Sequence, residues 1–390
     1  MGFMSRIYLD HAATTPMLPE AVEAMTRELT RVGNASSLHA SGRSARRVVE
    51  ESRETIAACV GAQPAEVIFT SGGTEAANLA IKGAFLAGLE SGRRGVVTST
   101  IEHHAVLDSV AWLGRTAAAD VRYLRVEEDG RLNMSALAGT VDSQTALVSV
   151  MWANNEVGTL QPISKIAALA AQHGVISHSD AVQAVGHIEV DFAAFGLDML
   201  SFTAHKLGGP YGVGALLARR ELRLAPILHG GGQERDVRSG TLDVAATAGF
   251  AAAVEIATRD RVAEEQRIRR LRDELARAVL DAVPEAIPYG PTAEVNRLPG
   301  IANIGFPGCS ADAILMLLDA AGIDCSTGAA CSAGVSQPSH VLIAMGCSEA
   351  EARSALRFSL GHTSTVADVS ALAAALPEAV RRAKAAAAFA

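Results

Sequence analysis

Long apolar runs and positive charge are both scarce in this sequence. No apolar run approaches the ~20 residues of a membrane-spanning helix, and the first residues, MGFMSRIYLD, lack the apolar region of a secretory signal. The net charge of −8 argues against sequence-independent binding of nucleic acid, which needs a basic surface. We therefore expect a cytoplasmic protein with no membrane segment and no direct nucleic-acid partner.

Cysteine is also rare. The sequence has five cysteines, an odd number at uneven spacing: Cys59, Cys309, Cys325, Cys331 and Cys347. No disulfide framework is expected from this pattern, and a reducing compartment fits it. The spacing matches no compact metal-ligand pattern such as C-x2-C, so we expect no resident metal or iron–sulfur cluster, although a transient cluster through Cys331 stays conceivable.

Lysine is scarcer still. The only lysines are Lys82, Lys165, Lys206 and Lys384, and the other basic residues are arginines. Lys82 and Lys165 lie in helical patterns and Lys384 in the Ala-rich end, where a solvated surface role is favoured. Any lysine chemistry is therefore expected from Lys206.

The residues that are abundant indicate a large globular α/β protein. Apolar residues make up 49% of the 390 residues, a length at which two domains are the usual outcome. Apolar runs alternate with helical patterns such as 163–173, which predicts βαβ units and a largely parallel sheet. The predicted strands are 66–70, 95–99, 121–126, 146–152, 175–179, 199–203 and 214–218. Apolar residues at helical spacing within 256–283 predict a long helix that leads into a second domain.

Ligands of such sheets bind beyond the carboxyl ends of the strands, where this sequence places several candidate residues. Gly73 and Thr74 follow the first predicted strand at the start of a helix, which suits a phosphate, although an ordinary glycine turn with Thr74 as helix cap is an alternative. Asp180 ends a buried strand, where a carboxylate needs a cationic partner. Lys206 follows another strand, beside His205.

Together these residues favour one cofactor, pyridoxal 5′-phosphate (PLP). A lysine forms a Schiff base with PLP, and a carboxylate keeps the pyridine nitrogen protonated so that the ring accepts electrons. Each signal is weak alone, and their joint placement at strand ends makes the interpretation stronger.

Motifs along almost the whole chain resemble those of the NifS/IscS-type cysteine desulfurases, in the class V branch of fold-type I PLP enzymes. They include YLDHAATTP at 8–16, NASSLHASGR at 34–43, FTSGGTEAANLAIKG at 69–83, EHHAVLD at 102–108, NNEVGTLQPI at 154–163, HSDAVQAVG at 178–186, SFTAHKLGGPYGVG at 201–214, HGGGQERDVRSGT at 229–241, CSTGAACSAG at 325–334 and RFSLGHT at 357–363. The resemblance implies an α/β fold with a large PLP-binding domain at 15–258. A smaller α+β domain, built from 1–14 and 259–390, would carry the cysteine loop.

The resemblance also implies roles for individual residues. Lys206 would hold PLP, with Asp180 at the pyridine nitrogen, Gln183 at the ring hydroxyl and His103 stacked on the ring, although the adjacent His104 leaves a one-residue ambiguity. The phosphate would be bound by Gly73, Thr74, Thr203 and His205, and Thr241 would reach the phosphate of a partner subunit, which implies a homodimer. The substrate carboxylate would be bound by Asn155 and Arg357, with Asn34 and His39 in the same region.

Cys331 would be the nucleophile of the implied reaction. The small residues around it in STGAACSAG favour an accessible loop, and the thiolate is the reactive form of cysteine. L-Cysteine would be converted to L-alanine while its sulfur passes to Cys331 as a persulfide. The sulfur would then go to acceptor proteins such as an iron–sulfur scaffold or a tRNA-thiolation enzyme. The loop favours the NifS/IscS group over the SufS-like group.

Other interpretations remain open at the level of sequence. A selenocysteine lyase would use nearly the same residues. A class V aminotransferase would use Lys206 with Cys331 incidental. A non-catalytic scaffold for sulfur-transfer assembly is disfavoured by the presence of Lys206, Asp180 and Cys331 together.

Overall fold

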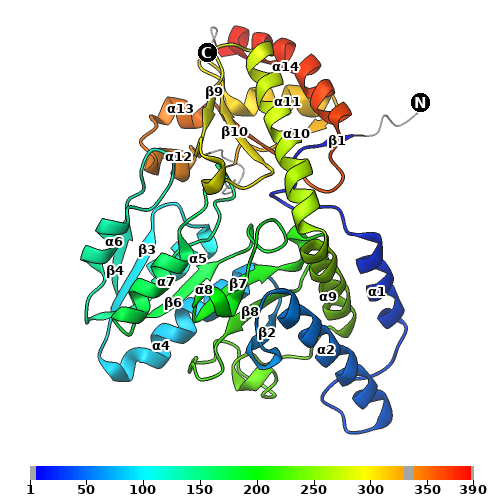
Figure 1. Ribbon diagram of the computed structural model, residues 1–390, viewed down its shortest axis with the longest axis vertical. Coiled ribbons are helices and arrows are strands. Elements are labelled where there is room, and N and C mark those ends of the chain that lie inside the picture. Colours follow the sequence, from blue (N-terminus) through cyan, green and yellow to red (C-terminus); the bar gives the residue numbers. More distant parts are fainter. Residues whose placement is uncertain (1–5, 329–336, 388–390) are drawn as a thin grey trace.

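A seven-stranded, mostly parallel sheet forms the centre of the lower part of the molecule (Figure 1). The computed structural model describes residues 6–328 and 337–387. The strand order in the sheet is β2-β8-β7-β6-β5-β3-β4, and β8 is the one strand antiparallel to its neighbours. These strands are β2 (Val67–Thr70), β3 (Gly95–Ser99), β4 (Asp120–Leu124), β5 (Thr145–Ser149), β6 (Ile176–Asp180), β7 (Met199–Thr203) and β8 (Gly214–Ala218).

Helices cover both faces of this sheet, which explains why all five residues of β3, β5, β7 and β8 are buried. Alternate residues of β2 belong to different apolar clusters, with Val67 and Phe69 on one face and Ile68 on the other. The helices of this part are α1 (Pro19–Leu29), α2 (Ala40–Cys59), α3 (Gly73–Asn78), α4 (Ala84–Gly88), α5 (His104–Thr116), α6 (Met134–Thr140), α7 (Ile163–Gln172), α8 (Phe192–Phe195) and α9 (Val244–Arg259).

A second, smaller unit with its own apolar cluster lies at the top of Figure 1. An antiparallel sheet of order β12-β10-β9 packs with three helices, and the short strands β1 and β11 pair in parallel. The elements of this unit are β1 (Ile7–Tyr8), α10 (Arg261–Ala282), β9 (Ile287–Tyr289), β10 (Ile301–Gly305), α11 (Ala311–Ala320), β11 (Ile323–Asp324), α12 (His340–Ala344), α13 (Glu349–Arg353), β12 (Ala355–Ser359) and α14 (Val366–Ala387).

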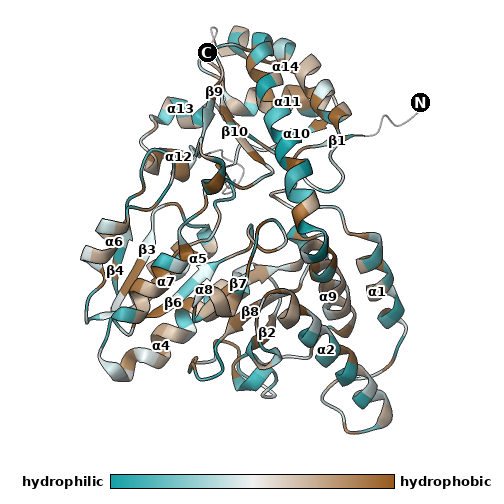
Figure 2. Cartoon of the chain, viewed as in Figure 1, coloured by the Kyte–Doolittle hydropathy of each residue, from teal (hydrophilic) through white to brown (hydrophobic). Residues whose placement is uncertain are grey.

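The predicted fold class is confirmed, and the element boundaries shift by a few residues. The predicted helix at 256–283 is α10, whose buried face contains Ile268, Leu271, Leu275 and Val279 as expected. The chain before it is a separate helix, α9, which ends at Arg259, and Asp260 alone joins it to α10. In Figure 2 the visible side of α10 is largely hydrophilic, which fits a helix that buries only one face. The boundaries 15–258 and 1–14 with 259–390 remain a prediction.

Candidate active site

A cavity of about 410 Å³ lies at the carboxyl ends of the sheet strands, between the two units. Ten of the residues that the sequence singles out line it: Gly73, Thr74, His103, Asn155, Asp180, Gln183, Thr203, His205, Lys206 and Arg357. They come from separate parts of the chain and meet because parallel strands end at one edge of the sheet.

Lys206 is placed in the cavity by β7 and the single helical turn Ala204–Lys206 that follows it. Its Nζ donates hydrogen bonds to the carbonyl oxygen of Ala12 and, at 2.7 Å, to that of Ala13. Burial and the positive charge of Arg357 lower the pKa of the Lys206 amine to about 8. The free amine, which is the nucleophilic form, is therefore more populated near neutral pH than in an exposed lysine.

Asp180 is the last residue of β6 and is 6% exposed. Among the described residues, its carboxylate is hydrogen bonded by the backbone N–H of Val182, at 3.0 Å, and has no ion-pair partner. Burial raises the pKa of Asp180, while the charges of His103 and Lys206 oppose the rise. A buried carboxylate without an ion-pair partner is suited to bind a cationic group that enters the cavity.

Gln183 and His103 flank this carboxylate in the cavity lining. The side-chain amide of Gln183 donates to Ala12 O at 2.8 Å. His103 caps α5, since its Nδ1 accepts from the backbone N–H of Ala105 at 3.1 Å. Burial lowers the pKa of His103, so its neutral ring is favoured.

His104 also lines the cavity, so the choice of stacking ring stays a prediction. Its Nδ1 lies 3.6 Å from the carboxylate of Asp108, one turn along the exposed side of α5. Its ring centroid is 5.1 Å from that of His340. The electrostatic influence of Asp180 and Lys206 acts on His103, which favours His103 for the central position.

The residues predicted to bind phosphate all line the cavity, and Gly73 lies beside Thr203. A Cβ atom added to Gly73, at the start of α3, would be 2.8 Å from Val182 Cγ2 and 3.7 Å from Thr203 Cβ, so the backbone there approaches its neighbours closely. Thr203 Oγ1 donates to Val213 O at 3.1 Å, and His205 Nδ1 lies 3.2 Å from Thr14 Oγ1. Gly72, whose φ is 149°, is the residue before α3, and Thr74 is not its cap.

Arg357 lies in β12 and reaches the cavity from the upper unit. It is 4% exposed; Nη2 donates to Asp10 Oδ1 at 2.6 Å, and Nη1 donates to the backbone oxygen of Asn155 at 3.0 Å. A guanidinium has five N–H donors, so these two bonds leave donors for a carboxylate in the cavity. The ion pair with Asp10 fixes the orientation of the guanidinium.

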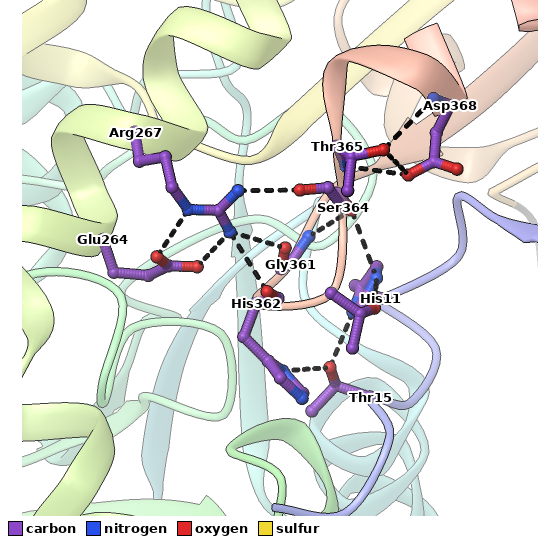
Figure 3. A network of polar contacts seen from close by, with 10 residues as sticks. His11, Thr15, Glu264, Arg267, Gly361, His362, Ser364, Thr365 and Asp368 are labelled. Atoms are coloured by element: carbon purple, nitrogen blue, oxygen red, sulfur yellow. Dashed lines mark hydrogen bonds and ion pairs between the residues drawn. The ribbon is translucent and has the colours of Figure 1, made fainter.

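Residues 10–15 join β1 to α1 and supply the carbonyl groups that hold Lys206. A network of polar contacts anchors this segment (Figure 3). Thr15 Oγ1 lies 2.6 Å from His11 Nδ1 and 3.3 Å from His362 Nδ1. Arg267 of α10 donates to the carbonyl oxygens of residues 361, 362 and 364 and pairs with Glu264.

Three predicted residues lie outside this cavity. Asn34 and His39 are exposed and have local contacts: Asn34 Oδ1 accepts from Ser36 N, and His39 Nδ1 accepts from Gly42 N at the start of α2. Thr241 is also exposed. A role of Thr241 at the phosphate would therefore have to be exerted in a second copy of the chain.

Cys331 lies outside the described residues. The other four cysteines are free thiols, and burial is the first cause that raises the pKa of each of them. For Cys325 the pKa rises to about 12. None of the four is therefore poised to form a thiolate, the nucleophilic state.

Sequence reasoning missed several residues of the cavity wall. The carbonyl groups of Ala12 and Ala13 have no side-chain signature, and the only signal was their position in the YLDHAATTP motif. Glu156 lies beside Asn155 in the NNEVGTLQPI motif, and no feature of the sequence distinguishes it from its neighbours. His340, nine residues after Cys331, had no signal; its Nε2 lies 3.0 Å from the backbone oxygen of Glu102.

The residues present fit PLP. The cavity combines a lysine amine for an aldehyde, a buried carboxylate without a cationic partner for a ring nitrogen, and a glycine-containing helix start for a phosphate. Within residues 6–328 and 337–387, no group of three or more His, Cys, Asp or Glu side chains is arranged to hold a metal ion. Nor is any helix there long and apolar enough to cross a membrane.

Comparisons with known proteins agree with this geometry. Residues 7–372 match the aminotransferase class-V family. The IscS-like cysteine desulfurase of Mycobacterium tuberculosis is 55% identical over 97% of this chain and 98% of its own. The cysteine desulfurase IscS of Dictyoglomus turgidum is 42% identical over 93% and 91% of the two chains.

A solved structure described as a NifS-like protein superposes with a TM-score of 0.88 at 32% identity, covering 99% of this chain and 100% of that one. The similarity therefore extends over both units of the fold and is not confined to the cavity. The chain belongs to the aminotransferase class-V family and, within it, to the IscS/NifS-like cysteine desulfurases.

Proposed function

We propose that this chain uses PLP to convert L-cysteine into L-alanine and transfers the sulfur to Cys331 as a persulfide. The observation that carries the proposal is the meeting of Lys206, Asp180 and Arg357 in one cavity, in a member of the cysteine desulfurase family. When bound, PLP supplies an electron sink for the negative charge that develops on the substrate.

The residues of the chain would then divide the remaining tasks. Arg357 and Asn155 bind and orient the substrate carboxylate, and the Lys206 amine takes the proton from Cα. The Cys331 thiolate attacks the sulfur of the substrate, so that an S–S bond forms while the Cβ–S bond breaks. The carbon product is protonated and leaves as alanine, with His103 placed to move a proton.

The persulfide sulfur would pass to an acceptor protein, such as an iron–sulfur scaffold or a tRNA-thiolation enzyme. We further propose a cytoplasmic homodimer in which Thr241 of one subunit completes the phosphate site of the other. A solved structure described as SspA in complex with cysteine, 32% identical over 91% of this chain, supports cysteine as the substrate class. Selenocysteine lyase or aminotransferase activity is the alternative.

The test uses three proteins and follows their bound PLP, their products from L-cysteine and their transfer of amino groups. The purified wild-type protein is expected to be yellow with bound PLP and to release alanine and, with a reductant, sulfide from L-cysteine. Cys331→Ser should keep the colour and lose sulfide release, and Lys206→Ala should lose the covalent link to PLP. Normal sulfide release by Cys331→Ser would overturn the assignment of the nucleophile. Transfer of an amino group to a keto acid, without sulfide, would favour the aminotransferase alternative.

A further inference from the structure

Glu156 is a buried acid of the cavity wall to which the proposed reaction gives no task. It is 3% exposed and has no ion-pair partner among the described residues. Its backbone is fixed on both sides: its N–H donates to Asn154 Oδ1 at 2.8 Å, and its carbonyl oxygen accepts from Asn303 Nδ2 at 3.2 Å. Only the carboxyl group is therefore left to contact other parts of the chain.

That carboxyl group lies near both described sides of residues 329–336. On one side lies Gly328, where an added Cβ would be 3.1 Å from Glu156 Oε2, so a side chain there would fit only if the acid shifted slightly. On the other side, Ser339 Oγ donates to the same Oε2 at 2.5 Å. One oxygen atom of Glu156 thus accepts a hydrogen bond from Ser339, just after this segment, and lies close to Gly328, the last residue before it.

Each of these ends leads to an ordered element. Ser326 and Arg357 exchange backbone hydrogen bonds of 3.1 and 2.6 Å, and the N–H of Gly328 donates to Ser326 Oγ at 3.1 Å. Ser339 caps α12, because its Oγ accepts from the N–H of Leu342 at 3.1 Å. The surroundings of the Glu156 carboxyl group are therefore connected through Ser326 to β12, which contains Arg357, and through Ser339 to α12.

The contacts of Glu156 need an acceptor oxygen and no charge. Burial raises the pKa of Glu156 to about 7, and the hydrogen bond from Ser339 and the positive charge of Arg357 oppose the rise. Arg357, which pairs with Asp10, and His340 of α12 also line the cavity. Both the acid and its anion offer an acceptor to Ser339, so glutamine is a close substitute.

We infer that Glu156 is a positioning residue for sulfur transfer: its carboxyl group binds the hydroxyl of Ser339 and packs beside Gly328, at the two described flanks of the segment that carries Cys331. This inference rests on the proposed function for the role of Cys331. It assigns Glu156 no contact with the reacting atoms. Its consequence is that loss of the acceptor should impair the step that uses Cys331 and leave substrate binding largely intact.

The test compares Glu156→Ala and Ser339→Ala with the conservative variant Glu156→Gln. Asp198→Asn is the matched control, because Asp198 Oδ2 also accepts from a serine hydroxyl, that of Ser177 at 2.9 Å, but does not line the cavity. Hydrogen–deuterium exchange is measured on peptides that cover Ser326–Gly328 and Ser339–Leu342. In the PLP-loaded proteins, the rate of persulfide formation on Cys331 and the Kd for L-cysteine are measured separately.

We expect exchange in both flanks to rise about tenfold in Glu156→Ala, as loss of one buried hydrogen bond implies. In Ser339→Ala the rise in the Ser339–Leu342 peptide should be at least as large, because α12 also loses its cap. Persulfide formation should fall about tenfold in Glu156→Ala while the Kd for L-cysteine stays within about threefold. Glu156→Gln should restore both readouts, and Asp198→Asn should change neither.

Unchanged exchange in Glu156→Ala would overturn the inference, as would equal losses in Glu156→Gln and Glu156→Ala. If Glu156→Ala fails to fold, Ser339→Ala decides through the peptide that covers Ser326–Gly328, since the other peptide also loses the cap of α12; unchanged exchange in Ser326–Gly328 would then overturn the inference. Failure of the proposed function is distinguished by the wild-type protein, which would then form no alanine or persulfide, whereas the exchange measurements need neither activity nor PLP.

Discussion

At the scale of single residues, the state of the Lys206 amine is set by its burial and by Arg357. With a pKa of about 8, the amine has a larger free fraction at neutral pH than an exposed lysine with a pKa near ~10.4. We predict that labelling of Lys206 by an amine reagent in the PLP-free protein rises with pH, with a midpoint at about 8.

Arg357→Ala tests how far the charge of Arg357 lowers the pKa of Lys206. Removal of the positive charge should raise the pKa of Lys206, so the labelling midpoint moves to higher pH. Mass spectrometry of the Lys206 peptide measures the Lys206 midpoint in the wild type and in the variant, with labelling of the exposed Lys165 as a reference in the same sample. A midpoint that stays in place or falls in Arg357→Ala would show that Arg357 does not act on Lys206 as described.

Glu102 gives a second prediction at this scale. The residue is fully buried, accepts from Ser99 Oγ and from Met151 N, and burial raises its pKa to about 8. Because the folded state binds this proton more tightly than the unfolded state does, Glu102 should lower the free energy of unfolding as pH rises from about 4.5 to about 8. Below that range its contribution is fully retained.

Glu102→Gln should remove this pH dependence. Urea unfolding of both PLP-free proteins at several pH values should show the wild type losing about 2–4 kcal/mol more than the variant across that range. Parallel pH profiles for the two proteins would mean that Glu102 is ionised in the folded state throughout.

The sequence was informative at this scale where function needs a particular side chain at a strand end. Asp180 and Lys206 could be found because a carboxylate after a buried strand and a rare lysine both stand out. Backbone acceptors such as the carbonyl of Ala12 could not, since every residue has one. The contacts of Glu156 depend on Gly328 and Ser339, which are far from it in sequence.

At the scale of elements, the segment of residues 10–15 depends on contacts with the chain after β12. Thr15 shares its hydroxyl between His11 and His362, and all three belong to the network of Figure 3. Thr15→Val keeps the shape of the side chain but leaves the two histidines without this partner. We predict a loss of about 1–3 kcal/mol in the free energy of unfolding, measured with urea.

A threonine on an exposed helix provides the control. Thr116 Oγ1 donates to the carbonyl oxygen of Trp112 at the end of α5, where water can replace the bond. Thr116→Val should change stability by no more than about 0.5 kcal/mol. Equal effects of the two substitutions would contradict the anchoring role of Thr15.

Most elements could be predicted because their periodicity is strong. The strands at 95–99, 199–203 and 214–218 were placed without error, since each is a short buried run. The antiparallel direction of β8 was not predicted, because the pairing partner of a strand is a property of the sheet. The break at Asp260 was also missed, since the charged pattern continues from α9 into α10.

At the scale of the whole molecule, the cavity lies between two units with separate apolar clusters, and Thr241 lies away from the cavity of its own chain. If Thr241 serves a partner subunit, mixed dimers of Lys206→Ala and Thr241→Ala should contain one site with both native residues. We predict that mixing and reassembling the two variants restores sulfide release that neither has alone. No restoration would mean that Thr241 acts within its own chain or has no role.

The central claim is that the cavity around Lys206 serves a reaction that moves sulfur from L-cysteine to Cys331. Single-turnover mass spectrometry of the PLP-loaded protein tests it most directly, with alanine quantified in the same sample. The account predicts one sulfur atom added to the peptide that contains Cys331 and an equal amount of alanine. Alanine formation without added sulfur on that peptide, or sulfur found on another cysteine, would contradict it.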